Sequence, residues 1–191
     1  MRRFLVLALL VGCGGAVSHK KDDVGFNSIS VGPVWDDPQR CLHAVKAGRR
    51  LARAEGRVRL GTWNIKWFPD GKPGNKPSEE GGTDVDWLAC TLAYLDVDII
   101  GLEEIKLTER GKAAQDQLLA KLGELSQAKW SLEVDACADP YRQHVALLYR
   151  TDRIIASHPK THGEIDPTVS KSRDKDAACP GHLRPALGVY A

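Results

Sequence analysis

The chain lacks a hydrophobic run long enough to cross a membrane. A bilayer-spanning helix needs roughly 20 consecutive apolar residues, whereas the apolar run near the N-terminus extends only from Phe4 to Val11. Arg2 and Arg3 precede this run, and small residues follow it, which is the pattern of an export signal. The sequence therefore indicates export instead of membrane insertion at this end.

The four residues Leu10 to Cys13 resemble a bacterial lipobox, in which cleavage before the cysteine leaves a lipid-modified N-terminus. We therefore expect residues 1–12 to be a lipoprotein signal peptide and Cys13 to be lipidated. The protein would then be a bacterial membrane-anchored lipoprotein that faces the periplasm or the cell exterior. The alternative is an ordinary secretory signal, cut near Ala16 or Ser18. Both interpretations place the protein outside the cytoplasm.

The chain also lacks a strong excess of charge of either sign. Its formal net charge is +2, and removal of Arg2 and Arg3 with the signal peptide would bring it to zero. Non-specific attraction to nucleic acid is therefore not encoded in the net charge.

No two cysteines are close enough in sequence to form a Cys-x-x-Cys ligand pair, which makes a zinc site of that kind a poor interpretation. With Cys13 set aside, an even number of cysteines remains, which in an exported chain indicates up to two disulfides with three possible pairings. These cysteines are Cys41, Cys90, Cys137 and Cys179. We expect disulfides, with Cys137 to Cys179 as the first pairing to consider.

Hydrophobic patterns along the chain predict alternating strands and helices, without an internal repeat. Thr83 is the expected N-cap of the second helix, and residues 68–82 and 159–181 are the expected long loops. The helices are expected over residues 39–55, 84–95 and 108–125, and the strands over 58–64, 97–102, 129–134, 144–150, 153–157 and 185–191. Such alternation predicts an α/β or α+β sandwich.

The first two expected strands each end in an oxygen-bearing side chain, Asn64 in one and Glu104 in the other. A helix lies between them, so the unit reads as a β-α-β crossover with parallel strands. Parallel strands present their carboxyl ends at one edge of the sheet, where open α/β sheets bind ligands. We therefore expect the two side chains to lie side by side.

An amide and a carboxylate at a sheet edge suit Mg²⁺, or Mn²⁺ in its place. Mg²⁺ prefers oxygen ligands, keeps several waters and commonly takes one or two protein carboxylates together with substrate phosphate. The alternative is that Asn64 caps a turn while Glu104 pairs with Lys106 or Lys66 at the surface.

Three stretches resemble, in the same order, the N-terminal motifs of the endonuclease/exonuclease/phosphatase superfamily. They are Thr62 to Ile65 (TWNI), Asp98 to Glu104 (DIIGLEE) and Val145 to Arg150 (VALLYR). The resemblance covers residues 57–191 and implies a deoxyribonuclease I-like β-sandwich with flanking helices. Members include nucleases, sphingomyelinases and inositol-phosphate phosphatases, so the motifs indicate the superfamily and not the substrate.

The resemblance also implies roles for individual residues. Glu104 matches the metal-binding glutamate, and Asn64 matches the asparagine that helps to hold the metal and its water. Glu103 stands where many members have glutamine. The residues that match substrate contacts are Lys106, Tyr141 and Arg184.

The family's C-terminal half supplies a histidine general acid, an Asp-x-Asn pair and a final Asp-His, and no segment after Arg150 resembles these motifs. We therefore expect residues 13–56 to be a tether with a short helix, and residues 57–191 to be the N-terminal half of the domain, truncated so that the second half is missing. None of the histidines at 144, 158, 162 and 182 is assigned to catalysis.

The expected function is that of an exported, Mg²⁺-dependent phosphodiester hydrolase, an endonuclease that acts on nucleic acid as a monomer. One alternative is a phosphatase or a sphingomyelinase-like phosphodiesterase of the same fold. Another is a catalytically inactive, truncated remnant or binding module.

Overall fold

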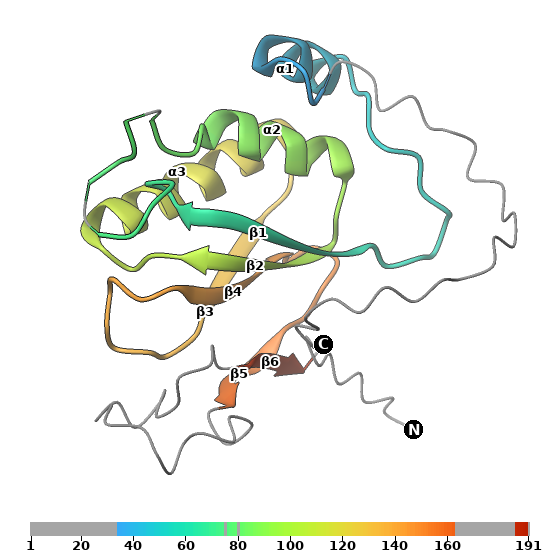
Figure 1. Cartoon of the computed structure of the whole chain (residues 1–191). Helices are drawn as coiled ribbons and strands as arrows, with labels where there is room; N and C mark the ends of the chain where they lie inside the picture. The colour runs from blue at the N-terminus through green and yellow to red at the C-terminus, as the bar shows by residue number, and fades with distance from the viewer. Residues whose placement is uncertain (1–33, 75, 80, 163–185, 191) are drawn as a thin grey trace, which may run out of the picture.

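The computed structural model describes residues 34–74, 76–79, 81–162 and 186–190 (Figure 1). The described helices are α1 (Pro38–Lys46), α2 (Val85–Leu95) and α3 (Glu109–Ser126). The described strands are β1 (Leu60–Phe68), β2 (Ile99–Ile105), β3 (Trp130–Val134), β4 (His144–Arg150), β5 (Ser157–His162) and β6 (Ala186–Tyr190). The mixed α and β class is as the sequence predicted, whereas the deoxyribonuclease I-like topology stays a prediction.

The strands form a four-stranded sheet in the order β1-β2-β4-β3 and a two-stranded sheet of β5 and β6. β1 and β2 are parallel, with α2 as the crossover between them, so the predicted β-α-β unit is present. β4 is antiparallel to both of its neighbours, β2 and β3.

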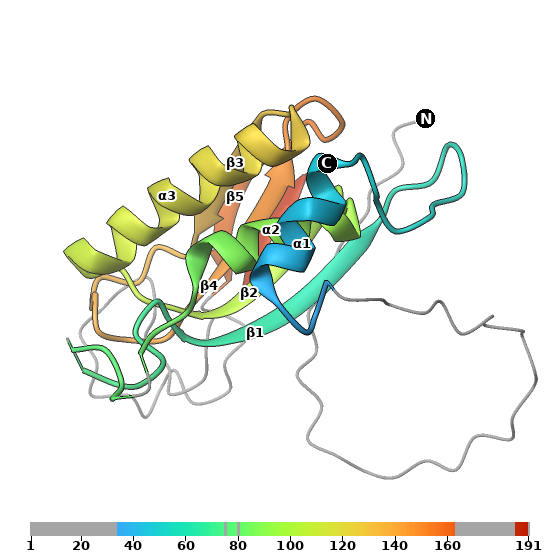
Figure 2. The same ribbon diagram turned by 90° about the horizontal axis from the view of Figure 1, so that it is seen from above.

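The larger sheet carries helices on one face and the β5–β6 pair on the other (Figures 1 and 2). Ile100, Leu102 and Leu148 point from the sheet into the helical layer, where α2 and α3 supply leucines and alanines. On the opposite face, Leu147 and Tyr149 of β4 form a smaller apolar cluster with Ile99 of β2 and Leu187 of β6. Alternation along the strands therefore separates two apolar layers.

α1 is shorter than predicted, because the chain turns at Gly48. Gly48 adopts a φ of 77°, a conformation that glycine tolerates better than other residues, and its N–H donates to the carbonyl of Val45. The α1 residues Cys41, Ala44 and Val45 belong to the main apolar core. The packed part of the chain thus includes residues that precede the first strand.

The N-cap of α2 is Asp84, whereas the sequence predicted Thr83. The Asp84 carboxylate accepts from the backbone N–H of Trp87, the usual bond of an N-cap. The backbone N–H of Thr83 instead donates to the carbonyl of Pro69. Thr83 is thus bonded to the loop after β1, and the helix begins one position later than predicted.

The fifth strand was predicted too early in the chain. Residues 153–157 were expected to be extended, but Arg153 and Ile154 donate back to the Arg150 carbonyl in a turn, and β5 begins at Ser157. Part of the expected loop over residues 159–181 is therefore strand, and residues 163–181 lie outside the described residues.

A disulfide joins Cys41 of α1 to Cys90 of α2, so the prediction of a disulfide is confirmed. Cys137 is also disulfide-bonded. The expected partner Cys179 lies outside the described residues, and this pairing stays a prediction.

Among the described helices, none combines the length and the apolar character needed to span a bilayer. The predicted signal peptide and the lipidation site at Cys13 lie outside the described residues.

Candidate functional site

One edge of the larger sheet collects several polar side chains. The pairing directions make β1, β2 and β3 run the same way, so their carboxyl ends and the start of β4 share this edge (Figure 1). Asn64 is the last residue of β1 in regular register with β2, Glu104 lies near the end of β2, Asp135 follows β3 and His144 opens β4. This is the edge at which open α/β sheets commonly bind ligands.

Asn64 and Glu104 are in direct contact. The Asn64 amide Nδ2 donates to Glu104 Oε1 at 2.9 Å. The backbone N–H of Trp67 donates to the other carboxylate oxygen, Oε2, at 3.2 Å. Asn64 Oδ1 accepts from the backbone N–H of Lys66 at 3.0 Å, so Asn64 also caps the turn after it. The structure thus combines the predicted pair with the turn that was its alternative.

Regular alternation would not have brought these two side chains together. Asn64 lies opposite Glu103 in the parallel register, and neighbours along a strand point to opposite faces. A regular β2 would therefore direct Glu104 to the other face, with Leu102. The predicted proximity holds, but strand geometry alone does not explain it.

Three residues with left-handed backbone conformation explain the contact. Lys66, Trp67 and Glu104 have φ values of 46°, 51° and 66°, where non-glycine residues are uncommon. Both strand pairings shift register at the same place. The irregular backbone turns the Glu104 carboxylate toward Asn64. Backbone strain of this kind gathers at functional sites, and here it lies around the predicted pair.

The donor set fits a hard divalent cation. The two carboxylate oxygens of Glu104 and the amide oxygen of Asn64 are ligands of the type that Mg²⁺ prefers. Glu104 is half-buried and Asn64 is exposed, so water and phosphate can reach the pair. A cation that keeps several waters needs this access.

Lys106 is not accessible to a substrate. Its side chain is fully buried, and Nζ lies 2.8 Å from Asp70 Oδ2 and 2.6 Å from the Gly74 carbonyl. Nζ also lies 5.7 Å from the centre of the Trp67 ring. The ammonium group therefore anchors the loop after β1 to the end of β2, and it is not a surface partner of Glu104.

The other predicted substrate contacts are divided between exposed and undescribed positions. Tyr141 is 51% exposed in the connection between β3 and β4, at the same sheet edge as Asn64. Arg184 lies outside the described residues. A role for Tyr141 in substrate binding stays a prediction.

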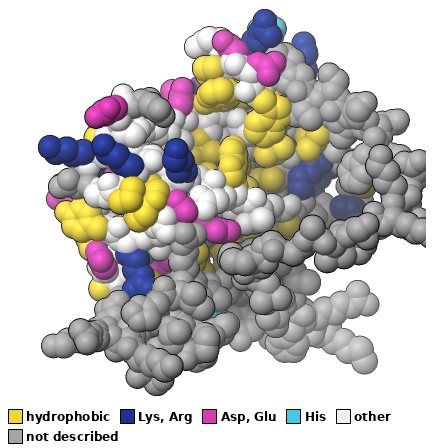
Figure 3. Space-filling model, in the orientation of Figure 1, with side chains coloured by type: hydrophobic (Ala, Val, Ile, Leu, Met, Phe, Trp, Pro, Cys, Tyr) yellow, Lys and Arg dark blue, Asp and Glu magenta, His cyan; other side chains and the backbone are white. Residues whose placement is uncertain are grey.

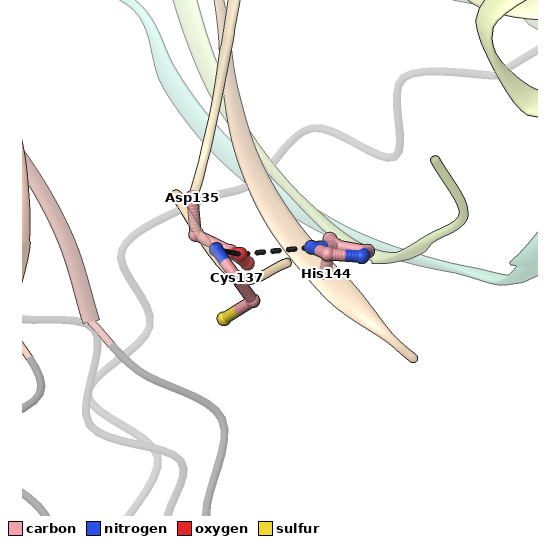
Figure 4. Close-up of side chains that lie close together, drawn as sticks. All are labelled: Asp135, Cys137 and His144. Atoms are coloured by element: carbon pink, nitrogen blue, oxygen red, sulfur yellow. Dashed lines mark hydrogen bonds and ion pairs between the residues drawn. The ribbon is translucent and has the colours of Figure 1, made fainter. Parts of the chain in front are cut away.

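A second polar group at this edge comprises Asp135, Cys137 and His144 (Figure 4). All three are buried, and their potential ligand atoms lie within 4.8 Å of one another. Asp135 Oδ1 lies 2.8 Å from His144 Nδ1, and Asp135 Oδ2 accepts from the backbone N–H of Val145 at 2.7 Å. His144 Nε2 lies 2.9 Å from the Asp139 carbonyl.

These bonds make the second group a clasp between β3 and β4, and the group is a poor metal centre. The side chains of Asp135 and His144 are fully buried, so the waters and phosphate that accompany a divalent cation cannot reach them. Metal binding by cysteine requires the thiolate, whereas the Cys137 sulfur is part of a disulfide. We therefore place the candidate cation site at Asn64 and Glu104.

The sequence did not single out Asp135 and His144, although a signal was present. Asp135 directly follows one expected strand, and His144 begins the next, so an antiparallel pairing places the two at the same edge. A carboxylate and an imidazole on either side of a connection between antiparallel strands therefore predict an Asp–His pair.

Comparisons of the chain with protein-family models, with curated proteins and with solved structures found no match.

Proposed function

We propose that this protein binds Mg²⁺ or Mn²⁺ at Asn64 and Glu104 and is a phosphodiester hydrolase of the endonuclease type. The contact between these two side chains, at the carboxyl ends of parallel strands, carries the proposal. The three sequence motifs that resemble the endonuclease/exonuclease/phosphatase superfamily support the same chemistry and a deoxyribonuclease I-like fold.

The proposed roles follow from the positions of the side chains. A cation at the pair neutralises negative charge on a bound phosphate. Lys66 is exposed two residues after Asn64, so its ammonium group can contact the backbone of a nucleic acid. Phosphate contacts of this kind position a substrate without reading its sequence.

A non-catalytic binding module is the second candidate, and the state of His144 favours it. Phosphodiester hydrolysis needs a group that activates water and a group that protonates the leaving oxygen. His144 lies at the same sheet edge, but both of its ring nitrogens are engaged with Asp135 and Asp139. Its imidazole is thus held as a structural group.

Titration with Mn²⁺, followed by electron paramagnetic resonance, tests the cation site. Glu104→Gln is expected to weaken Mn²⁺ binding at least about tenfold, because it removes the negative charge of the pair. Glu109→Gln, an exposed change in the first turn of α3, is the matched control and should bind as the unchanged protein does. Equal affinity of the two variants would contradict the proposal.

A plasmid-nicking assay separates the hydrolase from the binding module. Nicking that requires Mg²⁺, stops with EDTA and is lost in Glu104→Gln supports the hydrolase. Binding of Mn²⁺ without nicking supports the module. A choline phosphodiester offered in place of DNA tests the sphingomyelinase-like alternative, and a phosphate monoester tests the phosphatase alternative.

A further inference from the structure

An open groove of about 400 Å³ lies beside Asn64, between β1, the start of α2 and the segment before α1. Three of the chain's five tryptophans line it, namely Trp35, Trp63 and Trp87. Figure 3 shows hydrophobic side chains gathered on this face, between α1, α2 and β1. We call this feature the tryptophan groove.

The indole rings are held in place by packing and by a hydrogen bond. Trp35 and Trp63 meet edge to face, with ring centres 6.4 Å apart and planes at 67°. Trp87 Nε1 donates to the backbone carbonyl of Val34 at 3.0 Å. Trp35 nevertheless remains 39% exposed. Aromatic rings with restricted motion offer contact area at a low entropic cost.

The tryptophan groove is continuous with the candidate cation site. Asn64 and Lys66 line the groove and also take part in the contacts around Glu104. A ligand whose phosphate lies at this junction would therefore place its neighbouring group over the indoles.

Charge restricts what that neighbouring group can be. Asp84 lines the groove from the start of α2, so its carboxylate would repel a phosphate inside the groove, whereas the phosphates of a strand can lie outside it on the side of Asn64 and Lys66. A planar, uncharged ring meets no such repulsion and can stack on indole. A phosphate followed by a planar ring is the chemistry of a nucleotide, and aromatic side chains stack on bases in many proteins that bind single strands.

We propose that the tryptophan groove is a base-stacking subsite for single-stranded nucleic acid, next to the phosphate position at Asn64 and Glu104. This inference rests on the proposed function, since it assigns the phosphate to that site. Trp35 supplies the most accessible ring, and the bases stack on it without selection of sequence.

Fluorescence anisotropy of a labelled hexathymidylate tests the subsite with the full chain in EDTA, where no cation contributes to binding. Trp35→Ala is expected to weaken binding about tenfold or more. Trp35→Tyr keeps an aromatic ring and should stay within about threefold of the unchanged protein. Ile155→Ala, at an exposed apolar residue after β4, is the control and should leave binding unchanged. Circular dichroism checks the fold of each variant.

A hexamer of abasic sugar phosphates supplies the second arm, because it keeps the charges and lacks the rings. It should bind weakly and should be insensitive to Trp35→Ala. The subsite is overturned if the abasic hexamer binds as tightly as hexathymidylate, if Trp35→Ala has no effect, or if no binding is detected either in EDTA or with added Mn²⁺. Displacement by phosphocholine in preference to thymidine monophosphate would also overturn it, in favour of a quaternary ammonium ligand.

The two experiments distinguish a failure of the cation site from a failure of the stacking subsite. If Glu104→Gln leaves Mn²⁺ binding unchanged while Trp35→Ala weakens hexathymidylate binding, the cation site falls and the stacking subsite stands. If Mn²⁺ binding is lost in Glu104→Gln but Trp35→Ala is without effect, the stacking subsite falls alone.

Discussion

Lys106 is a charged residue that the fold keeps entirely inside the protein. Its ammonium group faces Asp70 Oδ2 on one side and the Gly74 carbonyl on the other, while Arg110 Nε lies 3.0 Å from Asp70 Oδ1. A buried charge is tolerated when it is paired and hydrogen-bonded, and this one is. The pair fixes the loop that follows β1 and thus supports the turn beside Asn64.

Removal of the Lys106 charge should destabilise the protein strongly. We expect Lys106→Met to lower the free energy of unfolding by about 3 kcal/mol, because it leaves Asp70 buried with a weaker partner set. Urea denaturation measures this. Lys121→Met, which breaks the exposed pair with Glu124, should cause no resolvable change. Equal effects of the two substitutions would show that the buried pair has no special weight.

Gly111 lies in α3 with no room for a side chain. Gly to Ala inside a helix usually stabilises by up to about 1 kcal/mol. A methyl group at Gly111 would, however, overlap the backbone carbonyl of Lys106. We therefore expect Gly111→Ala to destabilise by about 1 to 3 kcal/mol in thermal unfolding.

Gly123 in the same helix is the matched comparison for Gly111. The nearest atom to a methyl group there is the Ala128 carbonyl oxygen at 3.5 Å, an ordinary contact distance. Gly123→Ala should therefore stabilise the protein, and the same sign of change at both glycines would refute the close approach at Gly111.

At the scale of elements, α1 is joined to the rest of the fold by a covalent bond. The Cys41 to Cys90 disulfide connects α1 to α2 across 49 positions of sequence, and both sulfurs are buried. The segment before α1 carries Trp35, which lines the tryptophan groove. The disulfide thus links the stability of α1 to the shape of a proposed binding surface.

Removal of this disulfide should lower stability. Cys41→Ala combined with Cys90→Ala is expected to reduce the free energy of unfolding by about 4 kcal/mol, the chain-entropy value for a closed loop of this length. Chemical denaturation under oxidising conditions gives the difference. A loss of less than about 1 kcal/mol would mean that the reduced chain already holds α1 near α2 when unfolded.

At the scale of the whole molecule, one ionic cluster ties three distant segments together. Asp98 at the start of β2 accepts from Arg53 and Arg153, and Arg150 reaches Asp96 at the end of α2. Burial raises the pKa of the Asp98 carboxyl, but the bonds from Arg53, Arg153 and the Arg59 backbone outweigh it. The net pKa therefore lies well below its ordinary value of 3.8.

This lowered pKa predicts a specific dependence of stability on pH. A carboxyl group with a lower pKa in the folded state stabilises it above the unfolded-state pKa, and the contribution declines as pH falls below about 4. We expect Asp98→Asn to cost about 2 kcal/mol at pH 7, with the difference from the unchanged protein shrinking toward pH 3. Denaturation at several pH values measures it. Asp116→Asn, exposed on α3, should show no such trend.

Local hydrophobic patterns predicted much of this architecture. α2, α3 and β4 lie within a few residues of their expected ranges, because the side chains that bury them recur with the period of a helix or a strand. The parallel relation of β1 and β2 also followed from the helix between them. These features depend on residues that are close in sequence, so the sequence alone is enough to predict them.

The sequence could not show features that depend on distant partners. The burial of Lys106 requires Asp70, and the N-cap at Asp84 depends on the bond that draws Thr83 back to Pro69. The contact of Asn64 with Glu104 depends on left-handed backbone that no residue type in that stretch favours. The shared edge of the parallel strands thus predicted that the pair would lie close together, but not the irregular backbone that brings the two side chains into contact.

The backbone irregularity at Lys66 and Trp67 has a consequence for solubility as well as for the site. β1 has a strand partner on one side only among the described residues, and Leu60 on it is 48% exposed. An open strand of this kind is a template on which another molecule can extend the sheet and aggregate. The two left-handed residues interrupt the straight part of that template after Ile65. The backbone irregularity that accompanies the contact between Glu104 and Asn64 thus also shortens the strand edge on which neighbouring chains could aggregate.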